Sequence, residues 1–183
     1  MLKYALLGLL SYDPMTGYDL KQRMDRTTIH FWHAKQSQIY TTLKGMEKDG
    51  LVTSKVVDQS DHPAKRVYHI TQAGKADFQK WINTPIVEIM PKKELFVLKM
   101  FFAANMDKNS QLSQLQLQLD LHKHQLEYFQ GEMAEEVDDT KSKSPQLSED
   151  VEMWEATRRF GERYEEIYIE WLQYMISLVQ KKG

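Results

Sequence analysis

Residues 37–52, SQIYTTLKGMEKDGLV, decide the fold, because they combine a short amphipathic helix with the start of a strand. At 100° per residue, Ile39, Leu43 and Met46 fall within about 60° of one another and form one apolar stripe. The opposite side carries Ser37, Thr41, Lys44 and Lys48. Because hydroxyl, amide and lysine groups can contact base edges or phosphates, the stretch is typical of a DNA recognition helix. An ordinary amphipathic helix with a solvated face has the same pattern and stays an alternative.

Two β-prone runs after this helix predict a hairpin. Residues 52–57 and 65–71 are the two strands, and the turn-rich residues 58–64, DQSDHPA, separate them. Lys65 and Arg66 adjoin the tip. The hairpin therefore ends in positive charge, as a wing that lies along a phosphate backbone would.

Two further helices are predicted ahead of residue 37. Apolar residues 2–10 predict a buried helix that residues 11–14 close, and Thr16 with Asp19 predicts the capping box of a second helix. Two helices, a recognition helix and a hairpin, in this order, form a winged helix-turn-helix over about the first 71 residues.

The rest of the chain is predicted to be helical. Thr71 is the expected N-cap of a helix that runs to Ile82, and two more helices are expected over residues 92–104 and 151–179. Residues 138–149, rich in Asp, Ser and Lys and containing a proline, predict a loop. The fold class is therefore mainly α with a small β-hairpin.

A leucine pattern in the second half predicts pairing of two chains. Apolar residues between Leu112 and Met133 keep the 3,4 spacing of a coiled coil, with His122 in the seam. A monomer would leave much of this surface uncovered, so we expect a two-fold homodimer whose recognition helices, about 34 Å apart, enter successive major grooves. The predicted domains are residues 1–84, a winged helix-turn-helix DNA-binding domain, and residues 85–183, a helical dimerisation and effector-binding domain.

Composition and charge narrow the class of protein. The 183 residues contain no cysteine, which excludes disulfides and thiolate metal sites, and no run approaches the ~18 apolar residues of a membrane span. We therefore expect a cytoplasmic protein with no membrane partner. The net charge is −2, but residues 1–74 carry 10 Lys+Arg against 7 Asp+Glu, whereas the remainder carries 14 against 19. The positive excess on the N-terminal part, doubled in a dimer, is adequate for phosphate contacts.

The candidate DNA contacts fall into two groups. Those expected in the major groove are Ser37, Gln38, Thr41 and Lys44, near the N-terminus of the helix. Those expected at phosphates are Lys35, Lys65 and Arg66 and, at a helix N-terminus, Thr16, Gly17 and Tyr18. Tyr40 lies about 100° from the apolar stripe and either hydrogen-bonds a phosphate or shields the core. Gly45, in mid-helix, suggests the close approach of another backbone or of the second helix.

Neither catalysis nor a metal site is predicted. The sequence has no glycine-rich phosphate loop, no nucleophile elbow, no thiol and no histidine and carboxylate spacing for metal hydrolysis. His122 and His124 point about 200° apart on a helix, which disfavours a shared metal. His122 is instead expected to set the register of the seam or to meet an acidic ligand. We expect no enzyme and no cofactor.

Several motifs, in this combination and order, resemble the PadR family of bacterial transcriptional regulators. They are LKYALLGLL (2–10), TGYDL (16–20), FW (31–32), AKQSQIY (34–40), GLV (50–52), YHIT (68–71) with Gly74, KELFVLK (93–99) and YIEWL (168–172). The resemblance covers most of the chain and is to the long-tailed branch of the family. It implies a homodimeric repressor that binds operator DNA, a promoter palindrome, and leaves it when a small aromatic effector such as a hydroxycinnamic acid binds.

The aromatic residues of the second half are most simply core and dimer interface, but some are candidates for an effector site. Phe129 and Trp154 offer flat walls to a planar phenolic ligand, and Arg158, with Arg159 beside it, is the candidate partner of its carboxylate. Two other functions stay open. One is a multidrug-responsive repressor of an efflux pump, as in shorter members of the family, and the other is a winged-helix protein-interaction module on a helical scaffold.

Overall fold

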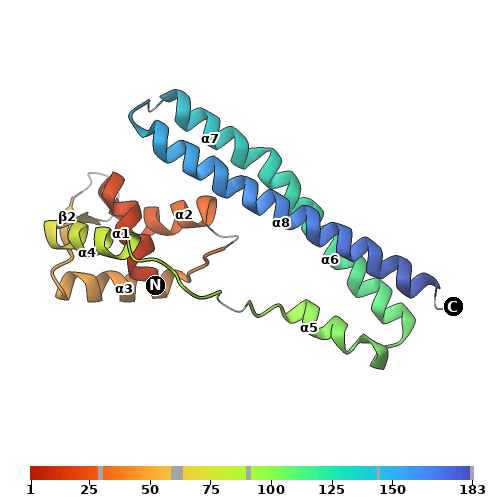
Figure 1. The fold of residues 1–183 in the computed structure, drawn as a ribbon. Helices are drawn as coiled ribbons and strands as arrows, with labels where there is room; N and C mark the ends of the chain where they lie inside the picture. The colour runs from red at the N-terminus through yellow and green to blue at the C-terminus, as the bar shows by residue number, and fades with distance from the viewer. Residues whose placement is uncertain (29–30, 59–63, 90–91, 144, 182–183) are drawn as a thin grey trace. The chain divides into compact units, whose positions relative to one another are not determined.

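The computed structural model describes residues 1–28, 31–58, 64–89, 92–143 and 145–181. The chain forms two compact units, Met1–Ile89 and Met90–Gly183 (Figure 1). The predicted domain boundary after residue 84 lies in the segment that follows the last helix of the first unit. None of the helices within the described ranges has the length and apolar character needed to cross a membrane.

The described residues of the first unit form four helices, in the order expected of a winged helix-turn-helix. They are α1 (Leu2–Tyr12), α2 (Gly17–Thr27), α3 (Gln36–Lys48) and α4 (Gln72–Ile82). The predicted capping box of α2 is present, because the Asp19 amide donates to Thr16 Oγ1 (3.1 Å) while the Thr16 amide donates to Asp19 Oδ2 (3.0 Å). The Gly74 amide likewise donates to Thr71 Oγ1 (3.0 Å), which confirms Thr71 as the N-cap of α4.

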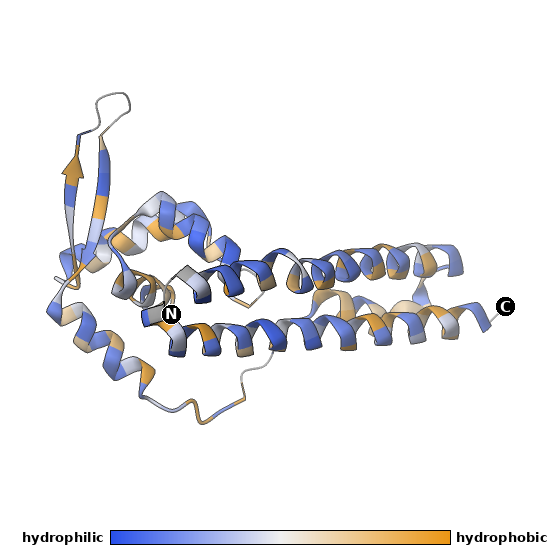
Figure 2. Ribbon diagram, turned by 90° about the horizontal axis from the view of Figure 1, so that it is seen from above, coloured by the Kyte–Doolittle hydropathy of each residue, from blue (hydrophilic) through white to orange (hydrophobic). Residues whose placement is uncertain are grey.

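The sheet of this unit has one strand more than the predicted hairpin. The hairpin strands β2 (Val52–Val57) and β3 (Lys65–Ile70) pair antiparallel, and the two-residue β1 (Met15–Thr16) pairs with the other edge of β3. Gly50, with φ +71°, makes the turn from α3 into β2, a backbone conformation that favours glycine. The hairpin projects beyond the helices of its unit (Figure 2). Residues 59–63 of the predicted tip lie outside the described residues.

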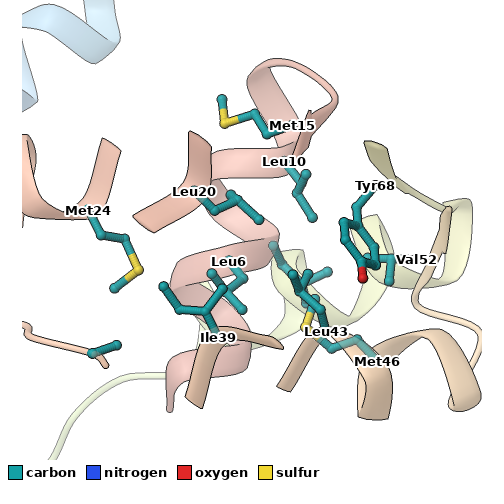
Figure 3. Packing of buried hydrophobic residues seen from close by; sticks show 12 residues of the cluster. Leu6, Leu10, Met15, Leu20, Met24, Ile39, Leu43, Met46, Val52 and Tyr68 are labelled. Atoms are coloured by element: carbon teal, nitrogen blue, oxygen red, sulfur yellow. The ribbon is translucent and has the colours of Figure 1, made fainter. Parts of the chain in front are cut away.

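A single apolar cluster holds the first unit together (Figure 3). The predicted apolar stripe of the recognition helix is confirmed, since Ile39 and Leu43 are fully buried and Met46 is 2% exposed. They pack with residues of the other elements, among them Leu6, Leu10, Leu20, Met24, Val52 and Tyr68. Because α3 buries one side here, its opposite side is left to solvent.

The second unit consists of helices, and α8 runs back alongside both α6 and α7 (Figures 1 and 2). Its elements are α5 (Leu95–Phe101), η1 (Ala103–Asn105), α6 (Lys108–Gln130), α7 (Glu132–Lys143), η2 (Pro145–Leu147) and α8 (Ser148–Lys181). The leucine seam is buried within the chain: Leu115 and Leu119 of α6 form a core with Leu172 and Val179 of α8. Tyr164 of α8 also donates a hydrogen bond to Glu94, the residue before α5 (2.8 Å).

Two sequence predictions about the second unit need correction. The predicted loop over 138–149 is wrong, because α7 continues to Lys143 and α8 begins at Ser148. Met133 and Val137, one turn apart on α7, are buried, and this apolar pair outweighs the polar composition around it. The helix predicted over 92–104 is shorter, Leu95–Phe101.

His122, the histidine of the leucine seam, faces α8 and contacts two of its side chains. Its Nδ1 lies against the Glu165 carboxylate, and its ring stacks on Tyr168 with centroids 3.8 Å apart. His124 turns elsewhere, to the carbonyl of Asp120 at 2.7 Å. In the part of the chain that the structure describes, no group of His, Asp and Glu side chains is arranged to hold a metal ion.

Candidate DNA interface

The exposed side of α3 carries every predicted major-groove contact. Ser37, Gln38, Thr41 and Lys44 are all exposed on the helix whose opposite side is buried. Two of them also make local hydrogen bonds. Gln38 Oε1 accepts from the Lys35 amide (2.8 Å), and Thr41 Oγ1 donates to the Ser37 carbonyl (2.9 Å). Gln38 therefore caps its own helix and keeps its amide N–H₂ as a donor, while Thr41 keeps lone pairs as an acceptor.

Gly45 lies on this exposed side, not at a packed contact. A Cβ built at Gly45 would meet no described atom within 4 Å. The prediction that another part of the protein approaches the backbone here is therefore wrong. Because glycine has no side chain, the backbone in the middle of the recognition helix is uncovered on the side of Thr41 and Lys44.

Tyr40 connects the recognition helix to the start of α2. A Cβ built at Gly17 would lie 2.5 Å from Tyr40 Cε1, so only glycine at position 17 lets the ring lie this close. Tyr40 remains 43% exposed. The ring thus covers the backbone of α2 while part of the side chain stays accessible. The contact of Tyr40 with a phosphate stays a prediction.

The N-terminus of α2 already has an anionic partner. The Asp19 carboxylate accepts from both the amide and the hydroxyl of Thr16, at 3.0 and 2.7 Å. A DNA phosphate near Thr16, Gly17 and Tyr18 would therefore approach beside a carboxylate, which weakens the electrostatic attraction of this helix end. Tyr18, 57% exposed, is the member of the three that reaches furthest into solvent.

The wing is joined to the recognition helix through Glu47, a residue that the sequence did not single out. Glu47 Oε2 lies 3.6 Å from Arg66 Nη1 on β3, and Glu47 Oε1 accepts a hydrogen bond from Ser54 on β2. Arg66 and Lys65 are exposed, as phosphate contacts require. Glu47 lies 19 residues from Arg66 in the sequence, so no local pattern reveals the pair.

The predicted effector residues lie together in the second unit, and Arg158 is fully engaged there. Its Nη1 donates to the Phe129 carbonyl (2.7 Å), and its Nε and Nη2 donate to the two oxygens of Glu155 (2.7 and 2.9 Å). Phe129 is fully buried, whereas Trp154 is half-buried one turn before Arg158. Hydrogen bonds from Arg158 and then Arg159 lower the pKa of Glu155 to about 2. A ligand carboxylate at Arg158 would therefore compete with Glu155.

Comparison with known proteins matches both units of the chain. Residues 6–80 match the transcriptional regulator PadR-like family, and residues 92–180 match the virulence activator alpha C-terminal family. The negative transcriptional regulator PadR of Bacillus subtilis is 28% identical, over 99% of this chain and 98% of its own.

Solved structures agree with the sequence matches over nearly the whole chain. The crystal structure of Bacillus subtilis PadR in complex with operator DNA has a TM-score of 0.83 and 26% identity, covering 97% of each chain. The structure of the same regulator in complex with p-coumaric acid has a TM-score of 0.72 and 25% identity, covering 98% of each. These relatives are DNA-binding regulators and not enzymes. The winged helix-turn-helix unit of the protein therefore carries a domain of the PadR-like family of transcriptional regulators, and the whole chain is similar to the regulator PadR.

Proposed function

We propose that the protein is a homodimeric repressor that binds a specific operator and is released from it by a small hydroxycinnamic acid. The observation that carries the DNA-binding part is the two-sided recognition helix. Ile39, Leu43 and Met46 anchor α3 in the core, and its hydroxyl, amide and lysine groups are exposed on the other side. The relative with known operator DNA supports the same role.

Each exposed group has a defined task in this proposal. Ser37, Gln38, Thr41 and Lys44 contact base edges in the major groove. Lys35 at the start of α3, Lys65 and Arg66 on the wing, and Tyr40 contact phosphates, with Thr16, Gly17 and Tyr18 as weaker contacts. Phosphate contacts release counterions, so operator affinity falls steeply as the salt concentration rises.

Exposed apolar side chains of the second unit support homodimer formation. Within α5 and just after it, Leu95, Leu98, Phe101 and Phe102 are between 56% and 80% exposed. Leu117 and Leu121 of α6 and Ile167 and Tyr174 of α8 are also exposed. A second copy that covers these residues would remove from water more apolar surface than a monomer usually leaves exposed.

The aromatic effector is supported by the relative that was crystallised with p-coumaric acid. Phe129, Trp154 and Arg158 remain our candidates for its site. The engagement of Arg158 by Glu155 means that binding of an acid there must open this ion pair. A response to hydroxycinnamic acids would then be coupled to a rearrangement between α6 and α8.

An electrophoretic shift assay with the DNA upstream of the protein's own gene tests the proposal. We expect dimer binding in roughly the nanomolar range, weakened by p-coumaric or ferulic acid. Lys44→Glu should abolish the shift, whereas Lys123→Glu, an exposed lysine on α6, should leave it intact. A Lys44→Glu variant that binds the operator normally would refute the DNA role, and a shift indifferent to phenolic acids would refute the effector role.

A further inference from the structure

A pocket of about 300 Å³ opens within the winged-helix unit, away from the exposed side of α3. Its walls come from α1, α2, α4 and the segment that joins α2 to α3, and they include Tyr4, Met24, Thr28, Trp32, Phe78 and Trp81. The volume lies at the lower end of the range of small-molecule sites, enough for a ligand built on a single ring.

Aromatic side chains are prominent among the residues that line this pocket. The rings of Tyr4 and Trp81 stack with centroids 4.6 Å apart and an interplanar angle of 6°, and Phe78 lies 5.9 Å from Trp81. Three elements thus contribute aromatic side chains to one concave surface, since Trp32 comes from the segment after α2. Planar aromatic molecules gain both buried area and favourable ring contacts on such a surface.

None of the described side chains that line the pocket is charged. The nearest charged pair that contacts a wall residue is Lys3 with Asp77, 2.7 Å apart, and the Lys3 Nζ lies 4.5 Å from the Tyr4 ring centroid. Because this lysine already has its carboxylate, a carboxylate buried in the pocket would lack a partner. The pocket therefore suits a ligand without charge on its buried part.

Some residues that line the pocket also contact the segment before the recognition helix or pack in the same cluster as that helix. Thr28 Oγ1 donates to the Trp32 carbonyl (3.2 Å), and the Phe31 amide donates to the Thr28 carbonyl (3.0 Å), so these residues shape the turn that leads into α3. Met24, 2% exposed, belongs to the same apolar cluster as Ile39 of α3 (Figure 3). A ligand that contacts Met24, Thr28 and Trp32 therefore touches the apolar cluster in which α3 packs and the segment that precedes α3.

We propose that this pocket binds a neutral, planar aromatic molecule, and that its occupancy shifts α3 and lowers operator affinity. The coupling half of this inference rests on the proposed DNA-binding function, whereas the binding half does not. The site is separate from Phe129, Trp154 and Arg158, which lie in the other unit. Regulation by a neutral aromatic compound would thus act inside the unit that holds the DNA.

Calorimetric titration of the full chain with methyl p-coumarate and with p-coumarate at about pH 7 tests the binding half, since the two probes differ in charge. We expect the ester to bind at least about tenfold more tightly than the acid in this pocket. Ala5→Leu, which fills the pocket from α1, should weaken ester binding about tenfold or more, and Lys123→Glu, at an exposed position on α6, should leave it unchanged. Trp81→Leu removes an aromatic wall of the pocket and should also weaken ester binding. It serves as the second variant if overpacking prevents Ala5→Leu from folding.

The outcomes test ligand binding in the pocket and its coupling to operator binding separately. No heat with the ester would overturn the binding site, and so would an equal ester affinity in the wild type and both pocket variants. The same ester should reduce the operator shift of the wild type but not of Ala5→Leu. Ester binding without any reduction would overturn the coupling, whereas absence of the operator shift itself would refute the proposed function and leave the titration result standing.

Discussion

At the scale of single residues, two glycines with opposite surroundings show what a methyl group does in this unit. Gly17 is buried beneath the Tyr40 ring, and Gly45 is exposed on the recognition helix with open space around it. The sequence singled out both positions but predicted the close contact at Gly45. Helical periodicity predicts the face on which a residue lies, but it does not predict what packs against that face. Only the structure therefore distinguishes the surroundings of Gly17 from those of Gly45.

Gly17→Ala should destabilise the protein. The added Cβ would lie 2.5 Å from Tyr40 Cε1, so the ring must move and the contact between α2 and α3 must open. Overpacking of this kind costs about 1–3 kcal/mol. Urea unfolding measures the loss, and operator affinity should fall with it because Tyr40 is displaced. An unchanged midpoint would show that the Tyr40 ring does not rest on Gly17 in solution.

Gly45→Ala should have the opposite effect on stability. Alanine is favoured over glycine in a helix interior by about 1 kcal/mol, and here the new methyl group meets no described neighbour. The same urea experiment should therefore show a higher midpoint. If operator affinity falls although stability rises, the glycine serves the close approach of DNA, since Gly45 shares the side of Thr41 and Lys44.

At the scale of elements, ion pairs fix the helices and the wing to one another. Glu47 holds the end of α3 to the wing through Ser54 and Arg66. Glu155 orients Arg158 on the same helix, and Arg158 holds α8 to the last turn of α6 through the Phe129 carbonyl. The first pair influences DNA binding through charge, and the second influences folding of the helical unit.

Glu47→Gln should tighten DNA binding a few-fold while leaving stability almost unchanged. Glutamine still accepts the hydrogen bond from Ser54 but no longer neutralises Arg66, and exposed ion pairs contribute only about 0–1 kcal/mol. Fluorescence anisotropy with labelled operator at several salt concentrations measures the effect. Weaker binding would mean that the pair is needed to orient Arg66, which Glu47→Asp should then restore in part.

Glu155→Gln should destabilise the helical unit by about 1.5–3 kcal/mol, the range for hydrogen bonds to charged groups. Glu152→Gln, at an exposed position three residues earlier on α8, is the matched control and should have little effect. The pKa of Glu155 is lowered from 4.5 to about 2, so its contribution is complete above about pH 4.5 and is lost as the pH falls towards 2. Thermal melts across this interval should show that the wild type loses the advantage it has over Glu155→Gln at neutral pH.

Elements with a strong local pattern could be predicted, and those that depend on distant partners could not. The stripe of Ile39, Leu43 and Met46 and the Thr71 cap are confirmed because periodicity and capping are local properties. Strand β1 has only two residues and exists through its pairing with β3. Helix α7 was missed because its polar composition conceals the buried pair Met133 and Val137. Glu47 was not foreseen either, because its partners lie on the wing and are distant in the sequence.

At the scale of the whole molecule, the open question is how two copies meet. Several apolar residues of α5 remain exposed in a single chain, with Phe101 80% and Leu98 56% exposed. A winged helix on its own reads one half-site, so the proposed repressor needs a partner that sets the spacing of the second.

Phe101→Glu should shift the protein from dimer to monomer and lower operator affinity. A charge at the centre of an apolar contact must be buried without a partner when the two copies associate. Sedimentation velocity at micromolar concentration measures the change. Val56→Glu, at a 61% exposed apolar residue on β2 of the other unit, is the control and should stay dimeric. A Phe101→Glu variant that remains a dimer would place the interface elsewhere on the helical unit.

The division of the hydrophobic core has a consequence for how such proteins can be built and inherited. One buried cluster is made from residues between Leu2 and Phe78, and the other from residues between Phe96 and Val179. Because neither cluster borrows a side chain from the other, a gene fusion that joins them anywhere between residues 83 and 92 would leave both interiors filled. The winged-helix unit is thus separable, and evolution or an engineer can join it to a different helical unit.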